Sequence, residues 1–313
     1  MTINLVGLAH LLRARGPIPQ VGALLTMSGD VTTYHDPTLP PVRIPGSLSL
    51  ILPAHNEVDN IEIVIRRALE VLPRHVDEFE IIPVNDGSRD ETGRVIDQLA
   101  REDHRVRPVH HRVNRGYGGA LKSGFTASRY DYVMFMDSDR QFDIEDIQRL
   151  APFVASHDIV AGFRMERSDP MIRRINAEVF NLAVRVLFGV HLRDLDCAFK
   201  IFRGDQLRSL TLTTSGALIN AEIQAKLRRQ GARIQQVGVP HYPRVAGKPT
   251  GGSLKVILKA MVETIQLWIH MHSYQPPKES KNSRPYYALG DTLLGLALGT
   301  VTAVTAGLLR RRK

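Results

Sequence analysis

Apolar, β-rich runs that alternate with helical stretches constrain the fold of this 313-residue chain most strongly. Strands that alternate with helices of this length are typical of a doubly wound α/β domain with a mainly parallel sheet. In such a sheet, ligands bind at the carboxyl ends of the strands, so the segment after each run belongs to the candidate site. The β-rich runs are 48–52, 79–84, 106–110, 132–136 and 158–161, and the helical stretches lie near 57–72, 90–103, 117–129 and 143–155.

Both flanks of this region have a different pattern. Residues 1–46 contain short apolar pieces and several prolines, which disfavour continuous regular structure and indicate an appendage. After the fifth run, we expect a helix near 172–188 and a strand pair at 193–202 and 233–239, with a helix near 219–230 between the two strands. The sequence thus predicts an appendage (1–46), an α/β domain (47–243), a basic juxtamembrane segment (244–285) and a membrane segment (286–313).

The C-terminal segment has the composition of a membrane span. Residues 292–309 contain no charged side chain over 18 residues, and four basic residues, 310–313, follow. That length matches the short end of the range needed to cross the hydrocarbon layer. A buried core helix is the weaker interpretation, because Gly295, Gly299 and Gly307 would destabilise a helix in water but are common in membrane spans.

An amphipathic helix is predicted just before that segment, over residues 253–270. Packing on the domain and lying at the membrane surface would both explain its apolar stripe. Between Arg244 and Arg284 there are seven basic residues against two acidic ones, which favours an anionic lipid surface. The stripe consists of Leu254, Ile257, Leu258, Met261, Ile265 and Trp268.

Charge and cysteine content narrow the classes of partner. Lys and Arg exceed Asp and Glu by 41 to 32, for a formal charge of +9, which indicates nucleic acid, a phosphate-rich small molecule or an anionic membrane as partner. Aromatic residues are only 6% of the chain and no nucleic-acid-binding module is recognisable, so we expect no nucleic-acid partner. The single cysteine, Cys197, excludes an internal disulfide framework and favours a reducing compartment. No cleavable secretory signal is expected, because no basic region precedes the apolar run 3–12.

Ligand-type segments follow four successive runs: PAHNE at 53–57, NDGSRD at 85–90, NRGYGGA at 114–120 and MDSDRQ at 136–141. An aspartate at a strand end can accept hydrogen bonds from a base or ribose, and a Gly-rich turn that opens a helix can receive an anion. Each segment alone has an ordinary structural explanation, such as a turn or a helix cap. Four of them at one edge of a sheet indicate a binding site.

The fourth segment, at 136–141, contains the candidate metal ligands. Asp137 and Asp139 are two apart at a strand end, where both carboxylates can hold one divalent ion together with the phosphates of a ligand. Oxygen ligands suit Mg²⁺ or Mn²⁺, so one of these is the expected cofactor.

In this order, the four segments resemble the inverting family-two glycosyltransferases of the GT-A fold, over roughly residues 47–240. Within that family the sequence is most similar to the dolichyl- or polyprenyl-phosphate mannose and glucose synthases. The resemblance implies a nucleotide-sugar donor of the GDP-mannose or UDP-glucose class. It places the donor nucleotide at Pro53, Ala54, Glu57, Asp86, Ser88, Gly118 and Asp137, and the metal at Asp137, Asp139 and Gln141.

Later segments resemble the acceptor side of the same family: GFR at 162–164, DCAFK at 196–200 and RVAGK at 244–248. The resemblance implies that Arg164, Arg173, Arg244 and Lys248 meet the acceptor phosphate, and that Asp139, Asp196 and Arg164 take part in catalysis. The chain departs from the family pattern at Ala177, where relatives have serine, and at Ala198, where glycine is usual.

The predicted function is metal-dependent transfer of a hexose, mannose or glucose, to polyprenyl phosphate, with inversion, at the cytoplasmic face of a membrane. A homo-oligomer is compatible with it. The main alternative is transfer to a sugar hydroxyl in polysaccharide or glycolipid assembly, which would need a base, and Asp196 is the candidate. A nucleotidyltransferase would carry its Gly-rich basic loop after the first strand, where this chain has PAHNE. The remaining alternatives are a nucleic-acid-binding protein and a non-catalytic membrane module. We do not expect Cys197 to be a nucleophile, because the sequence places no histidine partner beside it.

Overall fold

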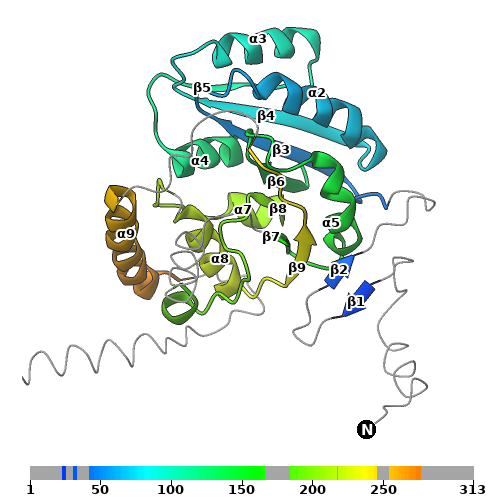
Figure 1. Cartoon of the computed structure of the whole chain (residues 1–313). Helices are drawn as coiled ribbons and strands as arrows, with labels where there is room; N and C mark the ends of the chain where they lie inside the picture. The colour runs from blue at the N-terminus through cyan, green and yellow to red at the C-terminus, as the bar shows by residue number, and fades with distance from the viewer. Residues whose placement is uncertain are drawn as a thin grey trace, which may run out of the picture.

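A nine-stranded sheet forms the centre of the computed structural model, which describes residues 23–25, 31–33, 42–165, 184–216, 218–244 and 254–275 (Figure 1). The strand order is β1-β2-β9-β7-β8-β6-β3-β4-β5. The strands are β1 (Ala23–Leu25), β2 (Val31–Thr33), β3 (Ser47–Ala54), β4 (Glu78–Asp86), β5 (Val109–His111), β6 (Tyr132–Met136), β7 (Ile159–Arg164), β8 (Phe199–Arg203) and β9 (Ile234–Val239).

Most strand pairs are parallel, as expected for a doubly wound sheet. β3 pairs in parallel with both β4 and β6, β4 pairs with β5, and β7 pairs with β9. β8 is antiparallel to both of its neighbours, β6 and β7. The expected pairing of 193–202 with 233–239 was wrong, because β7 lies between β8 and β9. Moreover, β8 begins only at Phe199, which leaves residues 193–198 as a loop beside the site.

Helices cover both faces of the sheet (Figure 1). α2 and α3 lie side by side on one face of the β3–β4 region, and α4 packs on the other face. α2 buries Ile61, Val64, Ile65, Ala68 and Val71, whose helical spacing forms one apolar stripe against the sheet. The helices are α2 (Ile61–Val71), α3 (Thr92–Glu102), α4 (Tyr117–Ala127), α5 (Ile147–Val154), α7 (Gly204–Arg208), α8 (Ile219–Arg229) and α9 (Leu254–Ser273), with 3₁₀ turns η1 (Leu72–Arg74) and η2 (Ile144–Asp146).

In the N-terminal region, which we expected to be an appendage without continuous regular structure, residues 23–25 and 31–33 form two short strands. β1 and β2 form an antiparallel pair, and β2 joins the edge strand β9 through Val31 and Val237. Pairing at that edge covers backbone groups of β9 that would otherwise be open to other chains.

The predicted amphipathic helix is present as α9, but its buried face differs from the predicted stripe. Leu267 and Met271 are buried in the core, whereas Ile265, a predicted stripe residue, is 58% exposed. Trp268 is partly buried against the core, as the stripe predicted. The backbone oxygen of Met271 accepts a hydrogen bond from Arg229 on α8 at 2.6 Å. This end of α9 therefore packs on the domain, and its outer side carries Ile265 and Ile269.

The predicted membrane segment, 286–313, lies outside the described residues. In the part of the chain that the structure describes, no helix combines the length and the apolar character needed to cross a bilayer.

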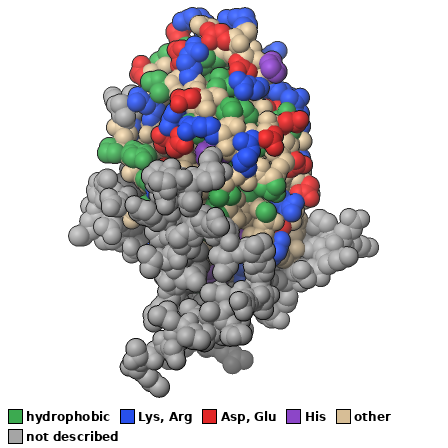
Figure 2. All heavy atoms as spheres, turned by 90° about the vertical axis from the view of Figure 1, so that its right-hand side faces the viewer, with side chains coloured by type: hydrophobic (Ala, Val, Ile, Leu, Met, Phe, Trp, Pro, Cys, Tyr) green, Lys and Arg blue, Asp and Glu red, His purple; other side chains and the backbone are tan. Residues whose placement is uncertain are grey.

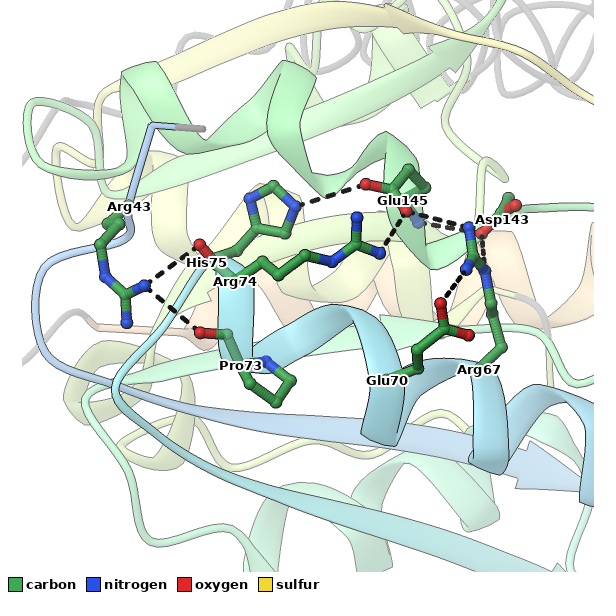
Figure 3. A network of polar contacts seen from close by, with 8 residues as sticks. All are labelled: Arg43, Arg67, Glu70, Pro73, Arg74, His75, Asp143 and Glu145. Carbon is green, nitrogen blue, oxygen red and sulfur yellow. Dashed lines mark hydrogen bonds and ion pairs between the residues drawn. The ribbon is translucent and has the colours of Figure 1, made fainter. Parts of the chain in front are cut away.

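A network of ion pairs fixes the segment that follows β6 (Figure 3). Glu145, on η2, accepts hydrogen bonds from Arg67 at 2.9 Å and from Arg74 at 2.7 Å. The buried ring of His75 lies 3.7 Å from the same carboxylate, and burial lowers the pKa of this histidine because the charged form loses its hydration. The network thus ties η2, which follows the DSD segment (137–139) in the sequence, to α2.

Basic and acidic side chains are interspersed on the described surface that faces the viewer in Figure 2. On that face the positive surplus of the chain does not gather into one basic patch.

Candidate donor and metal site

Three of the four ligand-type segments meet at one edge of the sheet. β3, β4 and β6 are adjacent and parallel, so the segments after them leave the sheet in the same direction. The register pairs Ala54, at the end of β3, with Asn85, near the end of β4. This is the convergence that the alternating pattern predicts.

The first two segments are joined by hydrogen bonds. Asn56 adopts a left-handed conformation (φ 56°), and its amide donates to the Ser88 hydroxyl at 3.0 Å. The Asn56 side chain accepts from the Arg89 amide at 2.8 Å, and the Glu57 amide donates to Thr92 at 2.9 Å. A non-glycine residue in this conformation is strained, and such strain often marks a binding site. These hydrogen bonds therefore hold the segments of the predicted donor residues Glu57 and Ser88 together.

Asp86 connects the second segment to the third. Asp86 is 3% exposed as a residue; one oxygen of its carboxylate lies 2.6 Å from the His111 ring, and the same oxygen accepts from the Arg115 amide at 2.8 Å. One carboxylate oxygen of Asp86 thus binds the backbone amide of Arg115, near the start of the Gly-rich turn. A contact between Asp86 and a nucleoside stays a prediction.

The Gly-rich turn makes room for another part of the chain. The Gly118 amide donates to the Ser215 carbonyl at 2.9 Å, and a Cβ atom on Gly118 would lie 2.7 Å from the carbonyl carbon of Ser215. Glycine is needed here because two backbone segments approach each other. Part of the helix N-terminus that was expected to receive an anion therefore contacts residues 215–216, and a donor contact at Gly118 stays a prediction.

The two carboxylates of the DSD segment lie in different surroundings. Asp139 is 5% exposed and accepts a hydrogen bond from the Gln141 amide at 3.1 Å. Asp137 is partly exposed and hydrogen-bonded to Tyr117. Loss of hydration and the nearby charge of Asp139 raise the pKa of Asp137 to about 7, although Tyr117, Arg244 and Lys200 act in the opposite direction. Burial and Asp137 raise the pKa of Tyr117 well above its usual value, so Tyr117 keeps its proton.

These residues fit a hard divalent cation. Asp137, Asp139 and Gln141 offer only oxygen ligands, and two neighbouring carboxylates would be relieved of their repulsion by a positive ion. Among the described residues, no group of three or more His, Cys, Asp and Glu side chains could hold a metal. A metal at Asp137 and Asp139 would therefore need the Gln141 amide and oxygen atoms from a ligand.

Arg244 reaches this place from more than 100 residues further along the chain. Its guanidinium is ion-paired with Asp139, donates to the Gln141 side chain at 3.4 Å and lies 3.9 Å from Glu57. The backbone supports the approach, because the Tyr242 amide donates to the Gln141 carbonyl at 2.9 Å. Burial and Asp139 raise the pKa of Glu57, while Asn60 and Arg244 oppose the rise. The structure thus brings a predicted acceptor residue onto the predicted metal ligands.

Arg164 is held by a partner that the sequence analysis missed. Its Nε and Nη2 atoms lie 2.6 and 2.7 Å from the two oxygens of Asp194, and the arginine side chain is 15% exposed. Burial alone would lower the pKa of Arg164, but the hydrogen bonds to Asp194 and its charge outweigh burial, so the pKa is raised above its usual value. Two parallel hydrogen bonds thus join the Arg164 guanidinium to the Asp194 carboxylate. The predicted contact of Arg164 with a phosphate stays a prediction. Arg173, Ala177 and Lys248 lie outside the described residues.

The loop before β8 carries Asp196 and Cys197. Asp196 is exposed, and its charge acts on Tyr117 and Arg164. Cys197 is fully buried, and burial together with Asp194 raises the pKa of its thiol to about 12, so it stays a thiol at neutral pH. Lys200, which the sequence analysis also missed, is fully buried and donates to the Leu195 carbonyl at 3.0 Å. The sequence pattern of β8 does not indicate that its lysine is buried.

A cavity of about 370 Å³ lies beside the DSD segment. Its lining is mostly apolar and includes Met136, Phe142 and Tyr242. Arg140 also lines it and, like Asn56, adopts a left-handed conformation (φ 63°).

Comparison with known proteins identifies the family. The sequence model described as Glycosyl transferase family 2 matches residues 49–212, about half of the chain, and includes all three segments that converge on the site. The chain therefore belongs to glycosyl transferase family 2.

Curated relatives include enzymes named for lipid-linked sugars. The chain is 31% identical over 207 residues to the glycosyltransferase AglD of Haloferax volcanii, covering 63% of this chain and 33% of that protein. It is 35% identical to an undecaprenyl-phosphate 4-deoxy-4-formamido-L-arabinose transferase of Pseudomonas fluorescens, covering 50% of this chain and 46% of that protein. The chain thus spans a third to a half of the length of these two relatives. It is 28% identical to the undecaprenyl-phosphate mannosyltransferase of Micrococcus luteus, covering 64% of this chain and 87% of that protein.

Solved structures share the fold. Glucosyl-3-phosphoglycerate synthase from Mycobacterium tuberculosis, in complex with Mn²⁺, UDP-glucose and phosphoglyceric acid, matches with a TM-score of 0.61 and 20% identity, covering 81% of this chain and 90% of that chain. This likeness confirms the expected doubly wound, GT-A-like architecture of the catalytic region.

Proposed function

We propose that this protein is a metal-dependent inverting glycosyltransferase that moves a hexose, mannose or glucose, from a nucleotide sugar to polyprenyl phosphate. The observation that carries the proposal is the meeting of Glu57, Asp137, Asp139 and Gln141 at one sheet edge, next to the ordered loop of Asn56 and Ser88. The names of the relatives, two of which act on undecaprenyl phosphate, support a polyprenyl phosphate as the acceptor.

For this reaction the protein needs mainly to supply electric charge and to hold donor and acceptor in position. An oxygen of the acceptor phosphate attacks the anomeric carbon, the bond from that carbon to the diphosphate breaks, and a nucleoside diphosphate leaves. Because the acceptor phosphate is already ionised near neutral pH, no strong base is required. Asp137, Asp139 and Gln141 would hold Mg²⁺ or Mn²⁺, which when bound supplies positive charge to the leaving diphosphate.

A panel of donors and acceptors tests the proposal. We expect purified full-length protein with Mn²⁺ or Mg²⁺ to form a lipid-linked product from a short polyprenyl phosphate and one labelled donor, among GDP-mannose, UDP-glucose and related nucleotide sugars. EDTA should remove the activity, and added metal should restore it. The absence of lipid-linked product with every donor would reject the polyprenyl-phosphate acceptor.

Transfer to a sugar hydroxyl is the second candidate, and the exposed carboxylate of Asp196 favours it. This side chain acts electrostatically on Tyr117, which hydrogen-bonds Asp137, so a base would be present beside the site. Including free mono- and disaccharides in the same panel separates the two reactions, because the products partition into different solvents.

The proposed location is the cytoplasmic face of a membrane. Besides the predicted segment 286–313 and the basic residues around it, α9 exposes Ile265 and Ile269, which are 58% and 60% exposed and one helical turn apart. We expect the double change Ile265→Ser and Ile269→Ser, made in a chain that ends at residue 285 so that the predicted membrane segment does not dominate, to weaken binding to anionic vesicles about fivefold, as measured by co-sedimentation. Ile63→Ser, at an exposed apolar position on α2, is the control and should leave vesicle binding unchanged. Equal binding of the double variant and the wild type would show that this side of α9 does not contact lipid.

A further inference from the structure

Arg244 occupies the oxygen atoms that the proposed metal would need. We propose that Arg244 is an internal counter-cation, which holds Asp139 and Gln141 in the metal-free protein and must release them before they can hold a divalent ion. The inference rests on the proposed function, because it concerns the same metal site. It adds an order of events: metal loading sets Arg244 free.

The oxygen atoms of the predicted ligands already have partners. One oxygen of Asp139 accepts from the Gln141 amide at 3.1 Å, and the other is ion-paired with Arg244. The side-chain oxygen of Gln141 accepts from Arg244 at 3.4 Å. Two of the three predicted metal ligands are thus engaged by one guanidinium. A guanidinium and a divalent ion repel each other and compete for the lone pairs of these oxygens, so each weakens the binding of the other at this place.

Charge explains why the arginine lies there. Glu57, Asp137 and Asp139 bring three carboxyl groups to one small region, and repulsion between them would destabilise an empty site. Arg244 is paired with Asp139 and lies 3.9 Å from Glu57, so it neutralises part of that charge. Its side chain is 28% exposed, which keeps water available to solvate the guanidinium when it leaves.

Release of Arg244 has a consequence for the acceptor. A freed guanidinium beside the metal site is a ready partner for a phosphate group, whether on the donor or on the acceptor. Metal loading would then strengthen phosphate binding at Arg244, and by thermodynamic linkage the bound phosphate would strengthen metal binding. Arg244 would thus become available to bind a phosphate only after the metal has bound on the donor side.

Titration of Mn²⁺ into the full-length protein without nucleotide tests the inference, with free Mn²⁺ measured by electron paramagnetic resonance at constant ionic strength. We expect Arg244→Gln to bind Mn²⁺ about tenfold more tightly than the wild type, which corresponds to about 1.4 kcal/mol. Arg94→Gln, on α3, removes the same charge from an exposed pair with Glu91 and should leave the affinity unchanged. Arg244→Lys keeps the charge but not the fork and should give an intermediate affinity.

The possible outcomes separate this inference from the proposed function. Equal or weaker Mn²⁺ binding by Arg244→Gln, in a variant with the thermal unfolding midpoint of the wild type, overturns the counter-cation role and leaves the glycosyltransferase proposal untouched. Asp139→Asn should weaken Mn²⁺ binding in both the wild-type and the Arg244→Gln background. If it does not, the metal does not bind at this carboxylate, and both the inference and the metal part of the proposed function fail.

Discussion

Replacing Asp139 with asparagine is expected to lower kcat/KM for sugar transfer at least about a hundredfold. The change keeps the size of the side chain but removes the charge that would hold a metal, and it also removes the ion pair with Arg244. Steady-state kinetics with the donor and acceptor found in the panel give the ratio directly. The backbone should change little, because the asparagine oxygen can still accept the hydrogen bond from the Gln141 amide.

Asp97→Asn is the matched control. Asp97 is an exposed carboxylate on α3, paired with His110, and its replacement should change kcat/KM less than about twofold, as is usual for surface positions. Activity of Asp139→Asn within threefold of the wild type would rule out a metal-holding role for this residue.

Replacing Asp137 with asparagine is expected to stabilise the metal-free protein at alkaline pH, although the variant should lose activity. The pKa of Asp137 is about 7 in the folded protein against an ordinary value of 3.8, so the folded state binds this proton more tightly than the unfolded chain. Stability from this group is therefore complete below pH 4 and is lost as the pH rises through 7. The difference corresponds to at most about 4 kcal/mol, and partial exposure reduces the expected gain to about 2 kcal/mol.

Thermal unfolding in EDTA at pH 8 and pH 5 measures this effect. At pH 8 we expect the Asp137→Asn midpoint to lie about 5 °C above that of the wild type, with a smaller difference at pH 5. Added Mn²⁺ should raise the wild-type midpoint at pH 8, because a ligand that binds only the folded state stabilises it, and should raise that of the variant much less. Glu91→Gln, which removes an exposed carboxylate paired with Arg94, should show no such pH dependence. A variant less stable than the wild type at pH 8 would contradict the destabilisation assigned to the charged form of Asp137.

The parts of the fold that the sequence predicted well are those with strong local periodicity. β3, β4 and β6 and the helices between them lie close to their expected bounds, because an apolar run bounded by turn residues has few other ways to bury itself. β8 was harder, since we expected a strand over 193–202, whereas residues 193–198 form the loop that carries Asp194 and Asp196. The buried face of α9 was also mispredicted, because Leu267 and Met271 are selected by contact with α8 and the core and not by the helical repeat alone.

The sequence by itself determined the family and the residues at the strand ends. Parallel strands place the segments that follow them at a common edge, so the meeting of PAHNE, NDGSRD and MDSDRQ follows from chain order and strand direction alone. Only the tertiary structure decided how those residues are paired. The contact of Arg244 with Asp139 spans 105 residues, and that of Arg164 with Asp194 spans 30. A periodic pattern does not predict such pairs. Which carboxylate a long basic side chain contacts depends on the distance between the two groups and on their hydration, and both are set only when the chain folds.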